Sequence, residues 1–208
     1  MNTENKTFLV TGGLGHIGSS LTDKLLDSGH TVLIVDDLST QRFPSLFGKF
    51  QHDNFYFINR SVQEKPVPGE IKSILEKSGS KLDVLIHLSA QTDAATSFDR
   101  EQELKANNIA STDAAISIAE TNNCRLIYPS STSVYGENSD LVTENSKTNP
   151  QSPYAESKLI EEAKVLREAS SSVILRLGTI AGPSIGMRFH TAVNSFIWKA
   201  IIGQPVTI

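Results

Sequence analysis

Short apolar runs alternate along the chain with longer stretches in which apolar residues recur every three or four positions. The apolar runs, which have the length and composition of buried strands, are 6–11, 31–35, 55–58, 83–88, 125–128 and 173–177. The stretches with helical periodicity are 17–28, 70–77, 100–122 and 154–170. Strands that alternate with helices imply right-handed crossovers, so the pattern predicts an α/β fold with a doubly wound parallel sheet.

Two connections in this pattern are longer than such units usually need. Residues 38–52 and 136–153 are rich in Pro, Ser, Asn and Gly. Loops at the carboxyl ends of parallel strands usually border the ligand site of this architecture. We therefore expect both loops to line a binding crevice.

A glycine-rich turn joins the first predicted strand to the first predicted helix. Its sequence is Gly12-Gly13-Leu14-Gly15-His16-Ile17-Gly18. Strand, glycine turn and helix in this order are typical of a dinucleotide-binding (Rossmann) site, whereas a turn that merely caps the helix is the alternative. Gly12 permits the tight turn, Gly15 lets the backbone approach a pyrophosphate, and Gly18 allows close helix packing. The helix N-terminus at His16 and Ile17 then offers N–H groups to the phosphates.

Two carboxylates follow the second predicted strand. Asp36 and Asp37 stand at the expected distance beyond the glycines. A carboxylate at this place accepts hydrogen bonds from ribose hydroxyls and repels a 2′-phosphate. The sequence thus favours NAD over NADP as the cofactor.

Tyr154 and Lys158 place a phenol and an ammonium four residues apart on a predicted helix. Residues at this spacing share a helix face, and a nearby cation favours the phenolate. A free tyrosine titrates near pH ~10, so full ionisation at neutral pH needs about 4 kcal/mol. The lysine supplies part of this, and a cationic cofactor supplies more. A solvated helix face is the ordinary interpretation of an isolated pair, but the upstream motifs favour catalysis.

The composition excludes several classes of function. Among 208 residues, 19 Lys and Arg face 23 Asp and Glu, and the net charge is −4, which does not suit nucleic acid. The single Cys124 allows neither an internal disulfide nor a cysteine cluster for metal, and we expect it in the core. We find no stretch that suggests a membrane span and no signal-peptide pattern, so we expect a soluble cytoplasmic protein without a metal.

At this point the motifs resemble those of a known family. In chain order they are Thr11-Gly12-x-x-Gly15-x-x-Gly18, Asp36, His87-Leu88-Ser89-Ala90, Asn108, Ser130–Gly136, Tyr154-x-x-x-Lys158 and Arg176–Pro183. This order is similar to that of the extended short-chain dehydrogenases/reductases, in particular the NAD-dependent epimerase/dehydratase branch that acts on nucleotide sugars. The resemblance runs nearly from end to end.

The resemblance implies roles for individual residues. Tyr154 would be the acid/base that takes a proton from a sugar hydroxyl, Lys158 would hold the nicotinamide ribose and lower the tyrosine pKa, and Ser131 would hydrogen-bond the reacting oxygen. Further cofactor contacts are implied for Ser61, Val62, Leu88, Ser89, Ala90 and Asn108, in addition to Tyr154 and Lys158. Substrate contacts are implied for Thr132, Thr179 and Arg188.

The residues after Ser131 narrow the reaction class. Sugar dehydratases of the family carry an Asp-Glu pair where this chain has Thr132 and Ser133, and the related decarboxylases usually keep the Glu. A 4-epimerase acting on a UDP-sugar such as UDP-glucose or UDP-galactose is therefore the leading interpretation. A sugar dehydrogenase or reductase, and an NAD-binding module without turnover, remain as alternatives.

Three features depart from the family pattern. Ser61 stands where relatives carry an Asp that holds adenine, and Thr179 stands where they carry an Asn that contacts the substrate phosphates. The chain also ends where relatives continue into a substrate lobe, so we expect an NAD-binding domain at 1–185 and an incomplete substrate lobe at 186–208. We expect NAD binding, poor turnover without a partner, and a homodimer formed through the helices at 100–122 and 154–170.

Overall fold

The computed structural model describes residues 4–91, 101–137, 141–189 and 191–206. Its strands are β1 (Thr7–Thr11), β2 (Thr31–Val35), β3 (Phe55–Ile58), β4 (Val84–His87), β5 (Arg125–Ser131) and β6 (Ser172–Leu177). Its α-helices are α1 (His16–Asp27), α2 (Val67–Ser78), α3 (Glu101–Thr121), α4 (Pro153–Glu168) and α5 (Ala192–Ile201). Short 3₁₀ helices lie at Phe43–Leu46, Lys49–Gln51 and Thr132–Tyr135.

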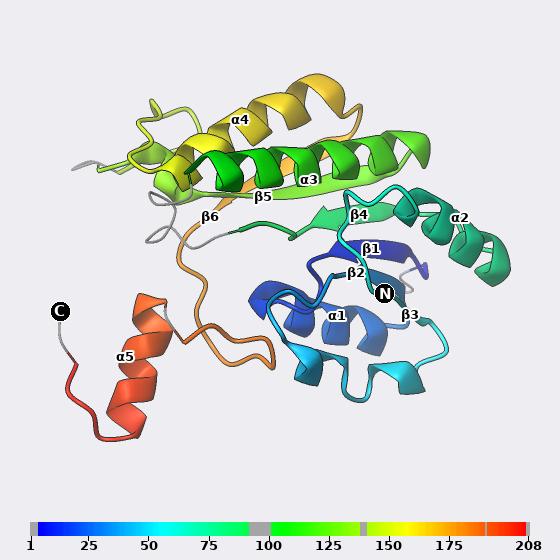
Figure 1. Cartoon of the computed structure of the whole chain (residues 1–208), viewed down its shortest axis with the longest axis horizontal. Coiled ribbons are helices and arrows are strands. Elements are labelled where there is room, and N and C mark those ends of the chain that lie inside the picture. The colour runs from blue at the N-terminus through cyan, green and yellow to red at the C-terminus, as the bar shows by residue number, and fades with distance from the viewer. Residues whose placement is uncertain (1–3, 92–100, 138–140, 190, 207–208) are drawn as a thin grey trace.

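The six strands form one parallel sheet in the order β3-β2-β1-β4-β5-β6. Helices α3 and α4 lie on one side of this sheet and α1 lies on the other (Figure 1). The doubly wound parallel sheet predicted from the alternation of strands and helices is therefore confirmed. The order reverses between β1 and β4, and ligands of such sheets bind at the carboxyl ends of the strands beside this reversal.

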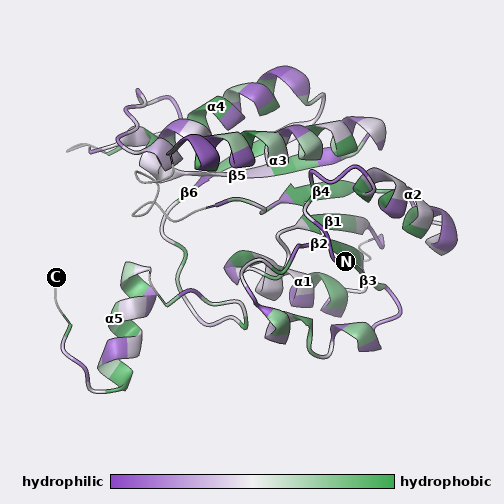
Figure 2. Cartoon of the chain, in the orientation of Figure 1, coloured by the Kyte–Doolittle hydropathy of each residue, from purple (hydrophilic) through white to green (hydrophobic). Residues whose placement is uncertain are grey.

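Each central strand is buried on both faces because its side chains alternate between two cores. In β2, Leu33 and Val35 belong to the core cluster that includes residues of α2, α3 and α4, whereas Val32 and Ile34 belong to the second cluster, which includes Leu26 of α1. The strands are accordingly coloured as hydrophobic in Figure 2. Near-continuous apolar runs of this kind are typical of parallel strands, which explains why the sequence identified them.

Two boundaries among β1–β6 and α1–α4 differ from the sequence prediction by three residues, and the others lie within two. Helix α2 begins at Val67 rather than at residue 70, with proline in its first turn, where the missing N–H costs nothing. Strand β5 continues to Ser131 because its last residues pair with β6, Pro129 with Leu175 and Ser131 with Leu177. The polar residues of that extension do not predict a strand, and it forms because it pairs with the backbone of β6.

The segment after β6 reaches α5, which lies apart from the sheet in Figure 1. Helix α5 spans Ala192–Ile201, and residues 204–206 beyond it form no strand.

Candidate active site

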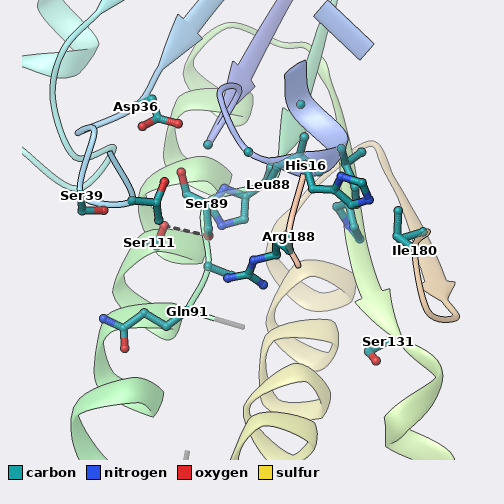
Figure 3. Close-up of a pocket in the computed structure, with 18 of the residues that line it drawn as sticks. His16, Asp36, Ser39, Leu88, Ser89, Gln91, Ser111, Ser131, Ile180 and Arg188 are labelled. Atoms are coloured by element: carbon teal, nitrogen blue, oxygen red, sulfur yellow. Dashed lines mark hydrogen bonds between the residues drawn. The ribbon is translucent and has the colours of Figure 1, made fainter. Parts of the chain in front are cut away.

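A cavity of about 710 Å³ opens at the carboxyl ends of the strands. Its walls come from the glycine turn after β1, the ends of β2, β4 and β5, helices α3 and α4, and the connection between β6 and α5. Figure 3 shows His16, Asp36, Ser89 and Arg188 gathered around it from separate parts of the chain. The pocket therefore lies where the topology predicts a ligand site.

The glycine turn has the geometry of a cradle for an anion. Gly12 has φ +63°, and a Cβ there would lie 2.8 Å from the Leu88 carbonyl carbon. A Cβ on Gly18 would lie 2.6 Å from Gly13 Cα, so α1 can approach the turn only with glycine at this position. Among the described residues, no side chain caps the first N–H groups of α1 and no acidic residue occupies its first turn. These free donors and the helix dipole fit a pyrophosphate.

Asp36 lies at the end of β2 and lines the pocket. Its carboxylate accepts hydrogen bonds from the backbone N–H groups of Leu14, at 3.2 Å, and Leu38, at 2.9 Å. Burial raises the pKa of Asp36, and these two hydrogen bonds oppose the rise. The same carboxylate thus braces the glycine turn while it faces the space in which a ribose would lie.

The connection between β6 and α5 docks against the glycine turn. Ser184 Oγ lies 2.7 Å from His16 Nδ1, and the Gly186 N–H donates to Ser19 Oγ at 3.2 Å. The Arg42 guanidinium donates to the Gly186 carbonyl oxygen. A segment more than 160 positions further along the chain is in this way fixed beside the N-terminus of α1.

This docking carries Arg188 into the pocket, where its side chain extends toward the centre in Figure 3. The positive charge of Arg188 opposes the rise of the Tyr154 pKa and, together with burial and Arg42, lowers the pKa of His16. An arginine at this place can face an anionic ligand that lies between the glycine turn and Tyr154.

Ser131 and Tyr154 both line the pocket, where burial raises the pKa of Tyr154 and the Ser131 hydroxyl opposes that rise. Ser131 is the last residue of β5, and the backbone N–H and hydroxyl of Ser133 both donate to its Oγ, at 3.2 and 2.9 Å. Tyr154 is in the first turn of α4, which Ser152 caps by accepting from the Ala155 N–H. The two hydroxyls can therefore face one substrate oxygen.

The predicted effect of Lys158 on Tyr154 is wrong for this structure. Lys158 Nζ lies 5.9 Å from the Tyr154 ring centre, but it donates to the Tyr128 hydroxyl at 2.9 Å and lies 3.6 Å from Glu161 Oε2. Burial, followed by the charge of Glu161, raises the pKa of Tyr154 rather than lowering it. The spacing of Tyr154 and Lys158 indicated the ammonium but not Glu161, the buried carboxylate that lies beside it.

Most residues proposed from the sequence do line the pocket. They are Gly12, Gly15, His16, Ile17, Gly18, Asp36, Asp37, Ser61, Leu88, Ser89, Ala90, Ser131, Tyr154, Lys158, Thr179 and Arg188. Val62 instead packs in the core beneath α2, and Thr132 is exposed outside the lining. Asn108 is buried, and its side chain bonds to the backbone of Gln91 twice. Its Oδ1 accepts from the Gln91 N–H at 2.8 Å, and its Nδ2 donates to the Gln91 carbonyl oxygen at 3.1 Å. Whether these residues bind cofactor or substrate remains a prediction.

Sequence reasoning missed three polar side chains beneath the pocket, Thr112, Tyr128 and Glu161, all of which are buried. Glu161 follows Tyr154 by seven positions and Lys158 by three, so it shares their helix face. That spacing could have identified Glu161. Thr112 on α3 and Tyr128 on β5 carried no comparable signal.

Two further observations concern the described residues as a whole. No group of three or more His, Cys, Asp or Glu side chains in this part of the chain could hold a metal ion, and none of its helices is long and apolar enough to cross a membrane. Cys124 is buried, as expected, and burial raises its pKa to about 11.

Comparison with known proteins gives concordant matches. A family model described as "NAD dependent epimerase/dehydratase family" matches residues 8–208. The chain is 28% identical over 216 residues to UDP-glucuronic acid decarboxylase 1 of Danio rerio, with 99% of this chain and 49% of that protein covered. It is 33% identical over 157 residues to UDP-glucose 4-epimerase of Mycolicibacterium smegmatis, with 74% and 48% covered.

A solved structure, UDP-glucuronic acid 4-epimerase of Bacillus cereus in complex with UDP-glucuronic acid and NAD, superposes with a TM-score of 0.81. Its sequence is 28% identical, and the match covers 97% of this chain and 65% of that one. The chain spans about half the length of the curated relatives that it matches.

Proposed function

The chain belongs to the NAD dependent epimerase/dehydratase family, and from this premise we propose that it is an NAD-dependent epimerase of a nucleotide sugar, of the UDP-glucose/galactose 4-epimerase type. The observation that carries the proposal is that Ser131, Tyr154 and Lys158 line the same pocket as the glycine turn. A solved relative with 28% identity was crystallised with NAD and a UDP-sugar.

In the proposed reaction Tyr154 takes the proton of a sugar hydroxyl, and Ser131 orients the reacting oxygen. NAD, when bound, supplies reversible hydride transfer. The oxidised sugar then turns in the site, and Tyr154 returns the proton after the configuration has been inverted. The glycine turn would hold the cofactor phosphates, Asp36 its ribose, and Arg188 an anionic part of the substrate.

The surroundings of Ser131 favour epimerisation over loss of water or carbon dioxide. Thr132 is exposed outside the pocket lining, and Ser133 uses its hydroxyl to donate to Ser131. Neither side chain carries a carboxylate that could protonate a leaving hydroxyl. These two side chains favour epimerisation where the names of the relatives do not decide, since those names include both epimerases and a decarboxylase.

The proposal extends to the organisation of the protein. We assign residues 1–185 to the cofactor module and 186–208 to the start of a substrate lobe, and we place two copies against each other through α3 and α4. The protein would act in the cytoplasm. Light scattering of the purified chain at several concentrations tests the dimer.

The function is tested with the purified chain and a panel of UDP-, GDP-, CDP- and dTDP-sugars, after mass spectrometry of the small molecules that co-purify. We expect retained NAD and slow interconversion of UDP-sugar epimers, since the chain is expected to turn over poorly without a partner, and Tyr154→Phe should slow this turnover by a further factor of about 10² or more. Tyr56→Phe, which alters a tyrosine on β3 outside the pocket lining, is the control.

Two results would overturn the proposal. Net oxidation or reduction with release of the cofactor in each turnover would indicate a dehydrogenase or reductase. Normal NAD binding without turnover of any sugar nucleotide would indicate a binding module.

A further inference from the structure

A fully buried carboxylate lies on the inner side of Lys158. The exposed fraction of Glu161 is 1%, and its Oε2 is 3.6 Å from Lys158 Nζ. The same oxygen accepts hydrogen bonds from the hydroxyls of Tyr128, at 2.7 Å, and Thr112, at 2.8 Å. Two O–H donors and an ammonium thus converge on one oxygen of Glu161.

A chain of hydrogen bonds leads to the same oxygen from the cofactor side of the pocket. The Ser89 N–H donates to Thr11 Oγ1 at 3.3 Å, and Thr11 Oγ1 lies 2.8 Å from His87 Nδ1. His87 Nε2 lies 3.4 Å from Thr112 Oγ1, which donates to Glu161. If the neutral imidazole carries its proton on Nε2, Nδ1 accepts from the Thr11 hydroxyl and Nε2 donates to the Thr112 hydroxyl. Burial lowers the His87 pKa to about 3, which keeps the ring neutral.

Glu161 affects both the position of the Lys158 ammonium and the electrostatic effect of that ammonium on its neighbours. Lys158 Nζ donates to Tyr128, whose hydroxyl donates in turn to Glu161, so the ammonium is drawn inward. Burial lowers the pKa of Lys158, and the charge of Glu161 opposes that change. The opposite charge of Glu161, one helical turn away, offsets the field of the ammonium at Tyr154.

We propose that Glu161 is a positioning residue for the reaction proposed above: through Tyr128 it holds the Lys158 ammonium on the inner side of the site, and its own charge offsets that of the ammonium near Tyr154. The inference rests on the proposed function, because it concerns the acid/base of that reaction. Tyr154 would then work as a neutral phenol until a second cation, such as an oxidised nicotinamide, enters the site.

In the part of the chain that the structure describes, three other charged side chains lie near Tyr154 and Lys158, namely Glu162, Arg176 and Arg188. Glu162, the next residue on α4, forms a two-point ion pair with Arg176 of β6, at 2.9 and 2.7 Å. On the pocket side, the Ser131 hydroxyl and the charge of Arg188 both oppose the rise of the Tyr154 pKa. Glu161 is the one carboxylate among the described residues that raises the Tyr154 pKa.

The test is the ionisation of Tyr154 in the purified full chain, measured as the ultraviolet absorbance of its phenolate. Subtracting the titration of the Tyr154→Phe variant isolates this tyrosine. Glu161 lies two helical turns beyond Tyr154, about 10 Å along the axis. One charge at that distance changes the proton affinity roughly tenfold, so Glu161→Gln should lower the midpoint by about one pH unit.

Matched variants separate charge from structure. Glu162→Gln removes an equally buried neighbouring carboxylate that pairs with Arg176, and it should leave the Tyr154 midpoint within a few tenths of a unit. Glu161→Asp keeps the charge and should restore most of the midpoint. If Glu161→Gln does not fold by circular dichroism, Glu161→Met, which replaces the carboxylate by an apolar chain of similar size, should give the same downward shift.

An unchanged or raised midpoint in the folded Glu161→Gln or Glu161→Met chain overturns the inference, and so does an equal shift in Glu162→Gln. The phenolate titration needs no sugar nucleotide. A lowered midpoint without epimerisation of any substrate would therefore support the role of Glu161 and refute the proposed function. Where turnover is seen, the acid limb of its pH profile should move down by the same amount.

Discussion

Gly186→Ala should release the β6–α5 connection from the glycine turn. An added Cβ would lie 2.5 Å from both the Leu14 and the Gly15 carbonyl oxygens. Both atoms belong to the backbone of a tight turn, so neither can move aside as a flexible side chain would. The connection must lift away, and Arg188 leaves the pocket with it.

The magnitude follows from the hydrogen bonds that docking makes. They are Gly186 N to Ser19 Oγ, Ser184 Oγ to His16 Nδ1, and Arg42 to the Gly186 carbonyl. At about 1 kcal/mol each, their loss removes about 3 kcal/mol of local docking free energy. Since 1.36 kcal/mol corresponds to a factor of ten, protection of the docked amides should fall roughly a hundredfold.

Hydrogen–deuterium exchange of the segment 184–189 measures this directly. The matched control is Gly178→Ala in the same connection, because an added Cβ there meets no atom within 4 Å. Its exchange should equal that of the unaltered chain. Unchanged protection of the Gly186→Ala segment would refute the reasoning, since it would mean that the turn absorbs the extra methyl group without undocking.

Two further predictions concern stability. Arg176→Leu leaves the buried Glu162 carboxylate without its partner and should cost about 3 kcal/mol in urea unfolding; a loss below 1 kcal/mol would show that the carboxylate is satisfied elsewhere. His87 is buried and its pKa is lowered to about 3, so between that value and 6.5 the unfolded chain binds more protons than the folded one. Stability should therefore fall as the pH drops through this range, and His87→Gln should make the fall shallower. An equal slope in both chains would contradict this.

The fold was largely predictable because its signals are local. Six apolar runs and the periodic stretches between them identified every strand and α1 to α4, since a parallel strand covered on both faces must be apolar along its length. The end of β5 was not predictable from Pro129 or Ser131, because the partner strand β6, rather than their own side chains, extends it. The start of α2 was recoverable from the prolines at 66 and 68.

The candidate site was predictable to the extent that it depends on spacing. The glycines, Asp36, Tyr154 and Lys158 occupy fixed positions within a turn, a strand end and a helix face, and the structure brings them to one pocket. Val62 and Thr132, for which cofactor and substrate contacts were expected, do not line it. Each adjoins a pocket residue in sequence, and the backbone turns its side chain elsewhere: Val62 packs in the core and Thr132 is exposed.

The sequence by itself determined the order of strands and helices, the glycine turn and the pairing of a tyrosine with a lysine, because each is encoded within a few neighbouring residues. Only the tertiary structure decided which groups the Lys158 ammonium contacts, namely Tyr128 and Glu161. Tyr128 and Glu161 are 33 positions apart, and Ser19 and Gly186 are 167 apart. The electrostatic field at a side chain is the sum over all charges packed around it, whatever their distance along the chain. The acidity of Tyr154 is therefore a property of the folded interior.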